Sequence, residues 1–525
     1  MLAAKPSPSP MAKPAAGTQL RLPRNGESKS RRLRPVHHAA RLPAVTNALS
    51  QSKNFSYDTE NNLTGLTDPD GHNISFSYDA DGRRVGLAYP NSVQTNYGYD
   101  AASELTQIIH QKNGTALVFA EYAYDSDGNR VSMATPDGTN VYSYDPLNRL
   151  ISASHPAPSN LPILNENFSY DPVGNRLSDA QISGYNYNAA NELVSNSSFT
   201  YSYDANGNLI SKIDSAGNKT TFSYDSENEL IGASMPSGVS AVYKYDALGR
   251  RIYKSTGSLP SQTQQFIYDN QNILAILDGN NNLVALFTHG PGIDEPLEIR
   301  QANGTEYFLH ADGLGSIVAA TDINGNLVER TEYESYGQPV FLDLRGASPV
   351  IESQSFTGSP YAFTSREWDG ESRLYFYRAR YYDPLAGRFI QQDPLGLIGG
   401  IDFYTYVTGN PVIGHDPLGM FNGFPVFNLP PGSMFPPNPP QFPIGQRVTF
   451  AQFMSCVESK LPRIVPNAIL IEVIADYLEL GPVLGPVVSG TALALDVQEC
   501  LMPPQNSCPL QSVPISNVLL PRGAQ

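Results

Sequence analysis

The chain has few cysteines, a single tryptophan and little charge for its length. Its 525 residues include 3 Cys and 1 Trp, and 16% of them are charged, with a net charge of −16. Cys456, Cys500 and Cys508 all lie beyond residue 450, so disulfide bonds do not hold the rest of the chain together. They lack the Cys-x-x-Cys spacing of a zinc site or a redox pair, and the histidines show no ligand spacing. The sequence therefore predicts no metal and no other cofactor.

Basic residues are scarce except at the N-terminus. Ten Lys or Arg residues and one acid, Glu27, lie between Met1 and Lys53 in a Pro/Ala/Ser background. No apolar run of about 7–15 residues follows these charges, so no secretory signal peptide is recognisable. We expect residues 1–49 to form a disordered basic arm, with a targeting sequence or an early start site as alternatives. The rest of the chain is acidic, which argues against a nucleic-acid partner, because a protein binds nucleic acid through a basic surface.

Long hydrophobic runs are also missing. One uncharged stretch, Leu480 to Leu495, is shorter than the roughly 20 residues that cross a bilayer. Pro482 and Pro486 interrupt it. A buried helical hairpin is therefore favoured over a membrane partner.

A Tyr-Asp pair recurs about every 21 residues, and this is the dominant feature of the chain. Such a fixed period indicates one supersecondary unit stacked many times. The copies are Tyr57-Asp58, Tyr78-Asp79, Tyr99-Asp100, Tyr124-Asp125, Tyr144-Asp145, Tyr170-Asp171, the divergent Tyr187-Asn188, Tyr203-Asp204, Tyr224-Asp225, Tyr245-Asp246 and Tyr268-Asp269.

Each copy predicts a short β-hairpin. In the copy that begins at Tyr203, Asn206-Gly207 favours a tight turn with positive φ, and residues 220–224 alternate with the period of a strand. The Asp can cap the turn, and the Tyr can pack on neighbouring copies while its hydroxyl bonds a polar partner. One hairpin is marginally stable, so the copies should stack into a long antiparallel sheet that curls to limit its edges. A calcium loop starting at Asp125 is disfavoured, because its twelfth position is Pro136 rather than Glu.

These copies resemble the YD repeats of the RHS family, which includes polymorphic toxins, toxin-complex C subunits and teneurin shells. The resemblance covers roughly residues 50 to 420. Residues 307–316 and 374–396, with Asn410-Pro411 and the segment from His415 to Met420, closely resemble the RHS-associated core. The resemblance implies an all-β fold, in which the antiparallel YD-repeat sheet curls into a cocoon-like shell.

In that family the core acts as an intramolecular aspartic protease that releases the variable C-terminal segment. By motif, the resemblance implies Asp393 and Asp416 as the catalytic carboxylates, Arg380 as their assistant, and a cut between Met420 and Phe421. Two neighbouring carboxylates cannot both ionise cheaply, so one can act as acid and the other as base. An arginine can orient a carboxylate or stabilise the oxyanion.

Two features oppose this interpretation. Asp-Pro-x-Gly is itself a turn signature and occurs at Asp171, where no chemistry is expected. His415 also precedes Asp416 directly, and a cationic imidazole there would hold the carboxylate ionised.

The chain therefore divides into five expected parts. After the arm come a YD-repeat shell (50–299), an RHS-associated core (300–420), a Pro-rich linker (421–446) and a small, mainly α-helical effector-like module (447–525). From Asp416 onward there is no histidine and there are four basic residues, which disfavours histidine-dependent nucleases and deaminases.

The favoured function is a bacterial toxin shell that encapsulates or presents its C-terminal module, cuts it free and delivers it outside the cell to a rival bacterium or a host. Its expected partners are that module, a second shell-forming chain or secretion component, and an immunity protein. The alternatives are a non-enzymatic adhesive surface array that contacts carbohydrate or other cells, and a truncated remnant.

Overall fold

The computed structural model describes residues 44–46, 52–156 and 162–420, all of which belong to one compact unit. Most of the expected basic arm, the linker and the C-terminal module lie outside the described residues. Ala44–Thr46, inside the expected arm, already form a strand.

The regular secondary structure of the described residues is almost entirely β-strand, and the strands form four antiparallel sheets. The first sheet contains β1 (Ala44–Thr46), β2 (Ser52–Tyr57), β3 (Leu63–Thr67), β4 (Asn73–Tyr78), β5 (Arg84–Ala88), β6 (Val93–Tyr99), β7 (Leu105–Lys112), β8 (Thr115–Tyr124), β9 (Arg130–Thr135), β10 (Gly138–Tyr144), β11 (Leu150–Ser154) and β12 (Glu166–Asn167). A two-stranded sheet follows, with β13 (Ser169–Tyr170) and β14 (Arg176–Ser178).

The largest sheet contains β15 (Asn186–Tyr187), β16 (Leu193–Ser195), β17 (Phe199–Tyr203), β18 (Leu209–Asp214), β19 (Lys219–Tyr224), β20 (Leu230–Ser234), β21 (Ser240–Tyr245), β22 (Arg251–Ser255), β23 (Thr263–Asp269), β24 (Asn272–Leu277), β25 (Leu283–His289), β26 (Pro296–Gln301), β27 (Glu306–Ala311), β28 (Ile317–Asp322), β29 (Leu327–Tyr333), β30 (Pro339–Asp343) and β31 (Val350–Glu352). The last sheet contains β32 (Glu367–Asp369), β33 (Leu374–Tyr377), β34 (Arg380–Asp383) and β35 (Arg388–Phe389). The helices in the described residues are short 3-10 turns: η1 (Pro260–Gln262), η2 (Phe363–Ser365), η3 (Gly396–Ile398) and η4 (Val407–Gly409).

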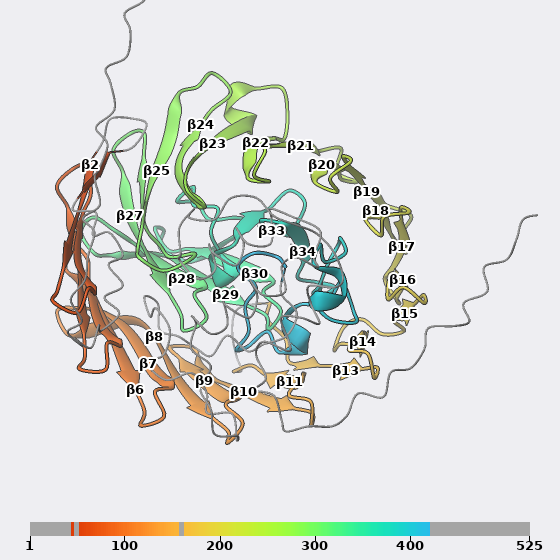
Figure 1. The fold of residues 1–525 in the computed structure, drawn as a ribbon, viewed down its shortest axis with the longest axis horizontal. Coiled ribbons are helices and arrows are strands. Elements are labelled where there is room, and N and C mark those ends of the chain that lie inside the picture. Colours follow the sequence, from red (N-terminus) through yellow and green to blue (C-terminus); the bar gives the residue numbers. More distant parts are fainter. Residues whose placement is uncertain (1–43, 47–51, 157–161, 421–525) are drawn as a thin grey trace, which may run out of the picture. The chain divides into compact units, whose positions relative to one another are not determined.

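In every sheet each strand pairs only with the strands before and after it in the chain. Figure 1 shows this order as a continuous progression of colour along neighbouring strands. The all-antiparallel YD sheet predicted from the repeat is therefore confirmed, with about two strands per Tyr-Asp copy.

The Tyr-Asp turn has one defined geometry, seen clearly at Asp204. Asp204 and Asn208 pair through the backbone at 2.9 Å, while the Gly207 amide donates to the Asp204 carbonyl at 3.1 Å. Gly207 takes the positive φ (78°), and the strand register shifts at Tyr203, which makes a three-residue hairpin loop with a bulge. The Asp204 Oδ1 accepts the Asn206 and Asn208 amides at 2.9 Å, which confirms the predicted cap.

The tyrosine of most pairs links its repeat to the one before. Tyr224 donates its hydroxyl proton to the Leu209 carbonyl at 2.9 Å, and Tyr245 donates to the Leu230 carbonyl at 2.7 Å. In both cases the acceptor lies six residues after the tyrosine of the preceding repeat. Leucine or arginine occupies this sixth position, and its side chain is buried in either case. The buried arginines at this position are Arg84, Arg130, Arg176 and Arg251.

The turn between β5 and β6 of the first sheet contacts β27 and β28 of the largest sheet, and the row of strands curls as predicted (Figure 1). The Tyr89 hydroxyl donates to the Leu309 carbonyl at 2.8 Å, and Asn91 Nδ2 donates to Thr321 Oγ1 at 2.9 Å. The four-stranded sheet packs on the inner side of the largest one, where Tyr381 of β34 joins the buried cluster formed by Phe222 and its neighbours. This inner packing (Figure 1) positions the core motifs.

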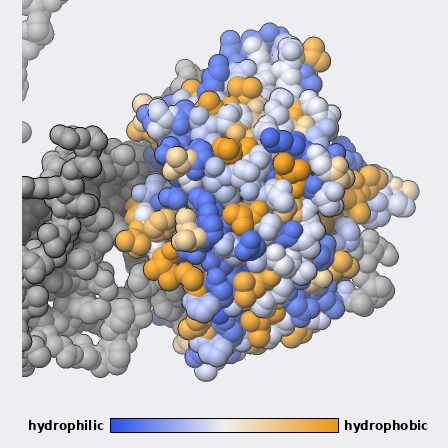
Figure 2. Space-filling view, turned by 90° about the vertical axis from the view of Figure 1, so that its right-hand side faces the viewer, coloured by the Kyte–Doolittle hydropathy of each residue, from blue (hydrophilic) through white to orange (hydrophobic). Residues whose placement is uncertain are grey.

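Outward-facing positions are mixed in character. On the face drawn in Figure 2, hydrophobic residues are interspersed with hydrophilic ones. In β21 the side chains alternate between exposed and buried, as the period of two requires. Within the described ranges, no helix has the length and apolar character needed to cross a membrane.

Candidate functional site

The three residues singled out from the core motif meet at one buried point. Arg380 begins β34, Asp393 lies in the turn after β35, and Asp416 lies in the turn after η4. Arg380 Nη2 is 3.0 Å from Asp393 Oδ2 and 3.4 Å from Asp416 Oδ2. All three side chains are fully buried. The two carboxylates therefore share one guanidinium nitrogen away from solvent.

Both carboxylates sit in Asp-Pro-x-Gly turns of the ordinary kind. The Gly396 amide donates to the Asp393 carbonyl at 2.9 Å, and the Gly419 amide donates to the Asp416 carbonyl at 3.3 Å. The difference from Asp171 is in the second carboxylate oxygen. Asp171 Oδ2 accepts Asn175 Nδ2 within its own turn at 2.9 Å, whereas the two core aspartates direct Oδ2 towards Arg380.

The predicted cleavage point lies next to this cluster. The Met420 amide donates to Asp416 Oδ1 at 3.1 Å, and Arg380 Nε donates to the Gly419 carbonyl at 2.5 Å. The turn is held against the β33–β34 hairpin, because the Ala379 amide donates to the Leu418 carbonyl at 3.2 Å. Phe421, on the other side of the predicted cut, lies outside the described residues.

Burial sets the protonation of the cluster. Desolvation raises the pKa of Asp393 above its usual value, the Asp416 carboxylate raises it further, and Arg380 acts against both. Desolvation also lowers the pKa of Arg380. The pKa of His415 is lowered by burial, against the influence of Asp294 and Asp416, which favours a neutral imidazole at neutral pH. The cationic His415 that would oppose an acid-base pair is therefore disfavoured.

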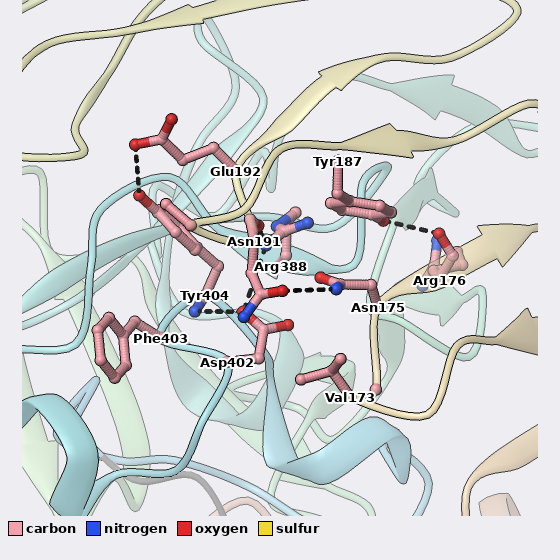
Figure 3. Close-up of polar contacts among 12 residues, drawn as sticks. Val173, Asn175, Arg176, Tyr187, Asn191, Glu192, Arg388, Asp402, Phe403 and Tyr404 are labelled. Carbon is pink, nitrogen blue, oxygen red and sulfur yellow. Dashed lines mark hydrogen bonds and ion pairs between the residues drawn. The ribbon is translucent and has the colours of Figure 1, made fainter.

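A neighbouring set of contacts, drawn in Figure 3, fixes the segment that supports Asp393 and Arg380. The Phe403 carbonyl accepts the Asp393 amide and Arg380 Nη1, both at 2.9 Å. Asp402 Oδ1 accepts the Tyr404 amide at 3.0 Å and lies 3.5 Å from Arg388 Nη2, which also donates to a carbonyl of the shell. The guanidinium of Arg388 lies over the Tyr404 ring, 5.0 Å from its centroid.

Sequence reasoning missed the supporting residues of this site. The Phe403 carbonyl carries no side-chain signal, and Arg388 and Asp402 are separated along the chain. One weak signal was the Gly399-Gly400 pair after the first Asp-Pro-Leu-Gly turn. A Cβ at Gly399 would lie 2.6 Å from Asp393 Oδ2, so glycine leaves room for the carboxylate there.

The chain matches the teneurin YD-shell family model over residues 36–160 and 163–397. It is 27% identical over 316 residues to double-stranded DNA deaminase toxin A of Burkholderia cenocepacia (strain H111), covering 55% of this chain and 21% of that protein. It is 37% identical over 113 residues to toxin protein Tse5 of Pseudomonas aeruginosa, covering 22% of this chain and 8% of that protein.

Among solved structures, a chain of the TcdB2-TccC3-Cdc42 crystal structure superposes with a TM-score of 0.54 at 21% identity. The superposition covers 72% of this chain and 21% of that one. At this level of identity, the superposition shows a similar fold. The chain spans about a fifth or less of the length of these relatives.

Proposed function

Because the chain belongs to the teneurin YD-shell family, we propose that it forms part of a toxin shell and cuts itself after Met420 to release the segment that follows. The observation that carries this proposal is the buried contact of Asp393 and Asp416 with one nitrogen of Arg380, beside the Met420 amide. A turn needs no such convergence, since Asp171 completes the same turn alone.

The chemistry follows from the different surroundings of the two carboxylates. Asp393, whose pKa is raised by burial, holds the proton, and Asp416 acts as the base. Asp416 takes a proton from a water molecule, which attacks the Met420 carbonyl carbon. Asp393 then protonates the leaving amide nitrogen of Phe421 as the bond breaks. Arg380 stabilises the negative charge that develops during the attack. Because catalyst and substrate belong to one chain, no binding step is needed.

The proposal assigns the remaining parts of the chain as well. Residues 421–446 serve as the linker and 447–525 as the released module, delivered outside the producing bacterium. An immunity protein is the expected partner of that module if it is toxic to its producer. A second shell chain fits the sheet edges, because within the described strands β1 pairs only with β2 and β31 only with β30. The solved TcdB2-TccC3-Cdc42 structure likewise carries the names of more than one component.

The direct test is the state of the purified full-length chain at neutral pH. We expect two fragments, one ending at Met420 and one whose N-terminal residue is Phe421, identified by intact mass and N-terminal sequencing. Acid hydrolysis of an Asp-Pro bond would give Pro417 as the new N-terminus instead. A chain that stays intact at neutral pH would contradict self-cleavage and leave a structural array as the better account.

A second prediction uses the space around Asp393. Gly399 has φ of −72°, which alanine tolerates, but the added Cβ would displace Asp393 Oδ2. Gly399→Ala should therefore slow cleavage by roughly 10- to 100-fold without removing any charged group. The rate is measured as loss of full-length chain during cell-free synthesis. Gly346→Ala is the matched control, because its nearest contact would be an ordinary 3.4 Å. If a folded Gly399→Ala chain is cleaved at the wild-type rate, Asp393 takes no part in the reaction.

A further inference from the structure

The Asp turn between β3 and β4 carries an unusual residue at its fifth position. In many of the Asp turns an Asn or Arg at this position donates a side-chain hydrogen bond to Oδ2 of the first Asp. Examples are Asn129 to Asp125 at 3.0 Å, Asn218 to Asp214 at 2.8 Å, Asn282 to Asp278 at 3.0 Å and Arg83 to Asp79 at 2.7 Å.

At the β3–β4 turn the fifth residue is His72. Its backbone closes the same loop, since the Asp68 amide donates to the His72 carbonyl at 3.0 Å. Its ring places Nδ1 3.2 Å from Asp68 Oδ2, and Nδ1 has no hydrogen-bond partner within the described residues. Two protein donors that bind one ion tetrahedrally at about 2 Å lie about 3.3 Å apart, which matches this separation.

A third donor comes from the other large sheet. Glu298 of β26 is 2% exposed, and its Oε2 has no hydrogen-bond partner within the described part of the chain. Asp68, His72 and Glu298 each offer one ligand atom within 4.8 Å of the others. A fourth group is near, because Glu306 Oε2 lies 3.6 Å from His72 Nδ1. A buried carboxylate oxygen left without a partner is costly, and a cation would remove that cost.

Two of the three donors, Asp68 and Glu298, face a small cavity. A cavity of about 20 Å³, enough for one ion or one water, is lined by Asp68 and Glu298. Lys53 and Arg300 also line it, but their charged groups have other partners. Lys53 Nζ donates to the Phe287 carbonyl at 3.2 Å, and Arg300 pairs with Asp70 at 2.6 Å. Lys53 also interacts electrostatically with Asp68 and Glu298, so a bound cation competes with this ammonium group.

We propose that Asp68, His72 and Glu298 form a binding site for one divalent transition-metal ion, with Zn²⁺ as the reference ion. An imidazole nitrogen with two carboxylates suits zinc or its neighbours better than Ca²⁺ or Mg²⁺, which prefer all-oxygen sites. The bound ion joins the β3–β4 turn of the first sheet to β26 of the largest sheet. Because the complete set exists only when both sheets are folded together, binding stabilises the folded chain.

The test is zinc titration of the full-length chain after chelator treatment and dialysis, with calorimetry, elemental analysis and thermal unfolding as readouts. We expect one equivalent of Zn²⁺ at this site, a Kd in the micromolar range or tighter, and a higher Tm with zinc. His72→Asn installs the residue that the chain itself uses at Asn129 and Asn218, so this variant should fold normally. It should lose that one equivalent, and Glu298→Gln should lose it too.

A matched control separates this site from any other zinc ligand in the chain. Asn282→His creates the same Asp-His turn at Asp278, which belongs to no candidate metal-ligand group among the described residues, and should add no equivalent. Binding that is unchanged in His72→Asn or in Glu298→Gln overturns the proposal. So does a wild-type chain that binds no Zn²⁺ up to about 100 µM.

Discussion

Replacing either Asp393 or Asp416 by asparagine should abolish release of the C-terminal segment and leave only full-length chain. Asparagine keeps the turn, since its side-chain oxygen still accepts the backbone amides, but it can neither donate an acid proton nor act as the base. Loss of one member of an acid-base pair should reduce the rate at least about 1000-fold. Time-resolved gel analysis after cell-free synthesis measures this directly.

The matched control is Asp171→Asn, which changes an Asp-Pro-x-Gly turn whose carboxylate bonds only within its own loop. That variant should be cut at the wild-type rate. Arg380→Ala should also prevent cleavage. This variant is harder to interpret, because it leaves two buried carboxylates without their shared cation and so also destabilises the fold. If Asp171→Asn and Asp393→Asn reduced cleavage equally, the loss of cleavage would result from disturbed folding. Asp393 and Asp416 would then not be a catalytic pair.

Arg251→Ala should cause the largest loss of stability among single substitutions of the shell. Arg251 is 1% exposed, donates to Glu367 Oε2 at 2.7 Å and pairs closely with Asp369. Removing the guanidinium leaves two buried carboxylates without their main cation, which costs about 3–5 kcal/mol. Lys254 also pairs with Asp369, at 2.7 Å, and offsets part of this cost.

The neighbouring residue provides the control. Arg250 pairs with Asp246 at 2.6 Å, but both side chains are more than 20% exposed, so Arg250→Ala should cost at most about 1 kcal/mol. Trp368 lies between Glu367 and Asp369 and is the sole tryptophan, so its fluorescence reports unfolding at this contact. The urea midpoints are best compared in the Asp416→Asn background, where the chain stays in one piece. Equal midpoints for the two arginine variants would show that the buried cluster contributes little.

The repeat predicted most of the fold because its signals are local. Tyr-Asp pairs, Asn-Gly steps and alternating residues fix turns and strands within one copy, and the structure has them where the pattern puts them. The buried arginines were not predicted. Composition rules place arginine outside, and only the acids of a distant segment, such as Asp369 for Arg251, make its burial favourable.

The candidate site shows the same division between local and distant information. The motif resemblance named Arg380, Asp393 and Asp416, but their convergence depends on how one strand and two separate turns pack. The Phe403 carbonyl, which contacts both Asp393 and Arg380, has no sequence signature. Likewise, His72 alone gives no indication of a ligand set, because Glu298 comes from another sheet.

The strictly consecutive pairing of the strands has a consequence for the chain during its synthesis. A strand that leaves the ribosome finds its partner in the segment made just before it, so the sheet can grow in step with translation. The core motifs come last and depend on contacts with strands made much earlier, such as Lys212 with Asp383 at 2.9 Å. Asp416 is the last of the clustered residues to emerge. The carboxylate pair can therefore assemble only after all the strands before it have been synthesised, which delays the proposed cut until the YD-repeat sheets have emerged.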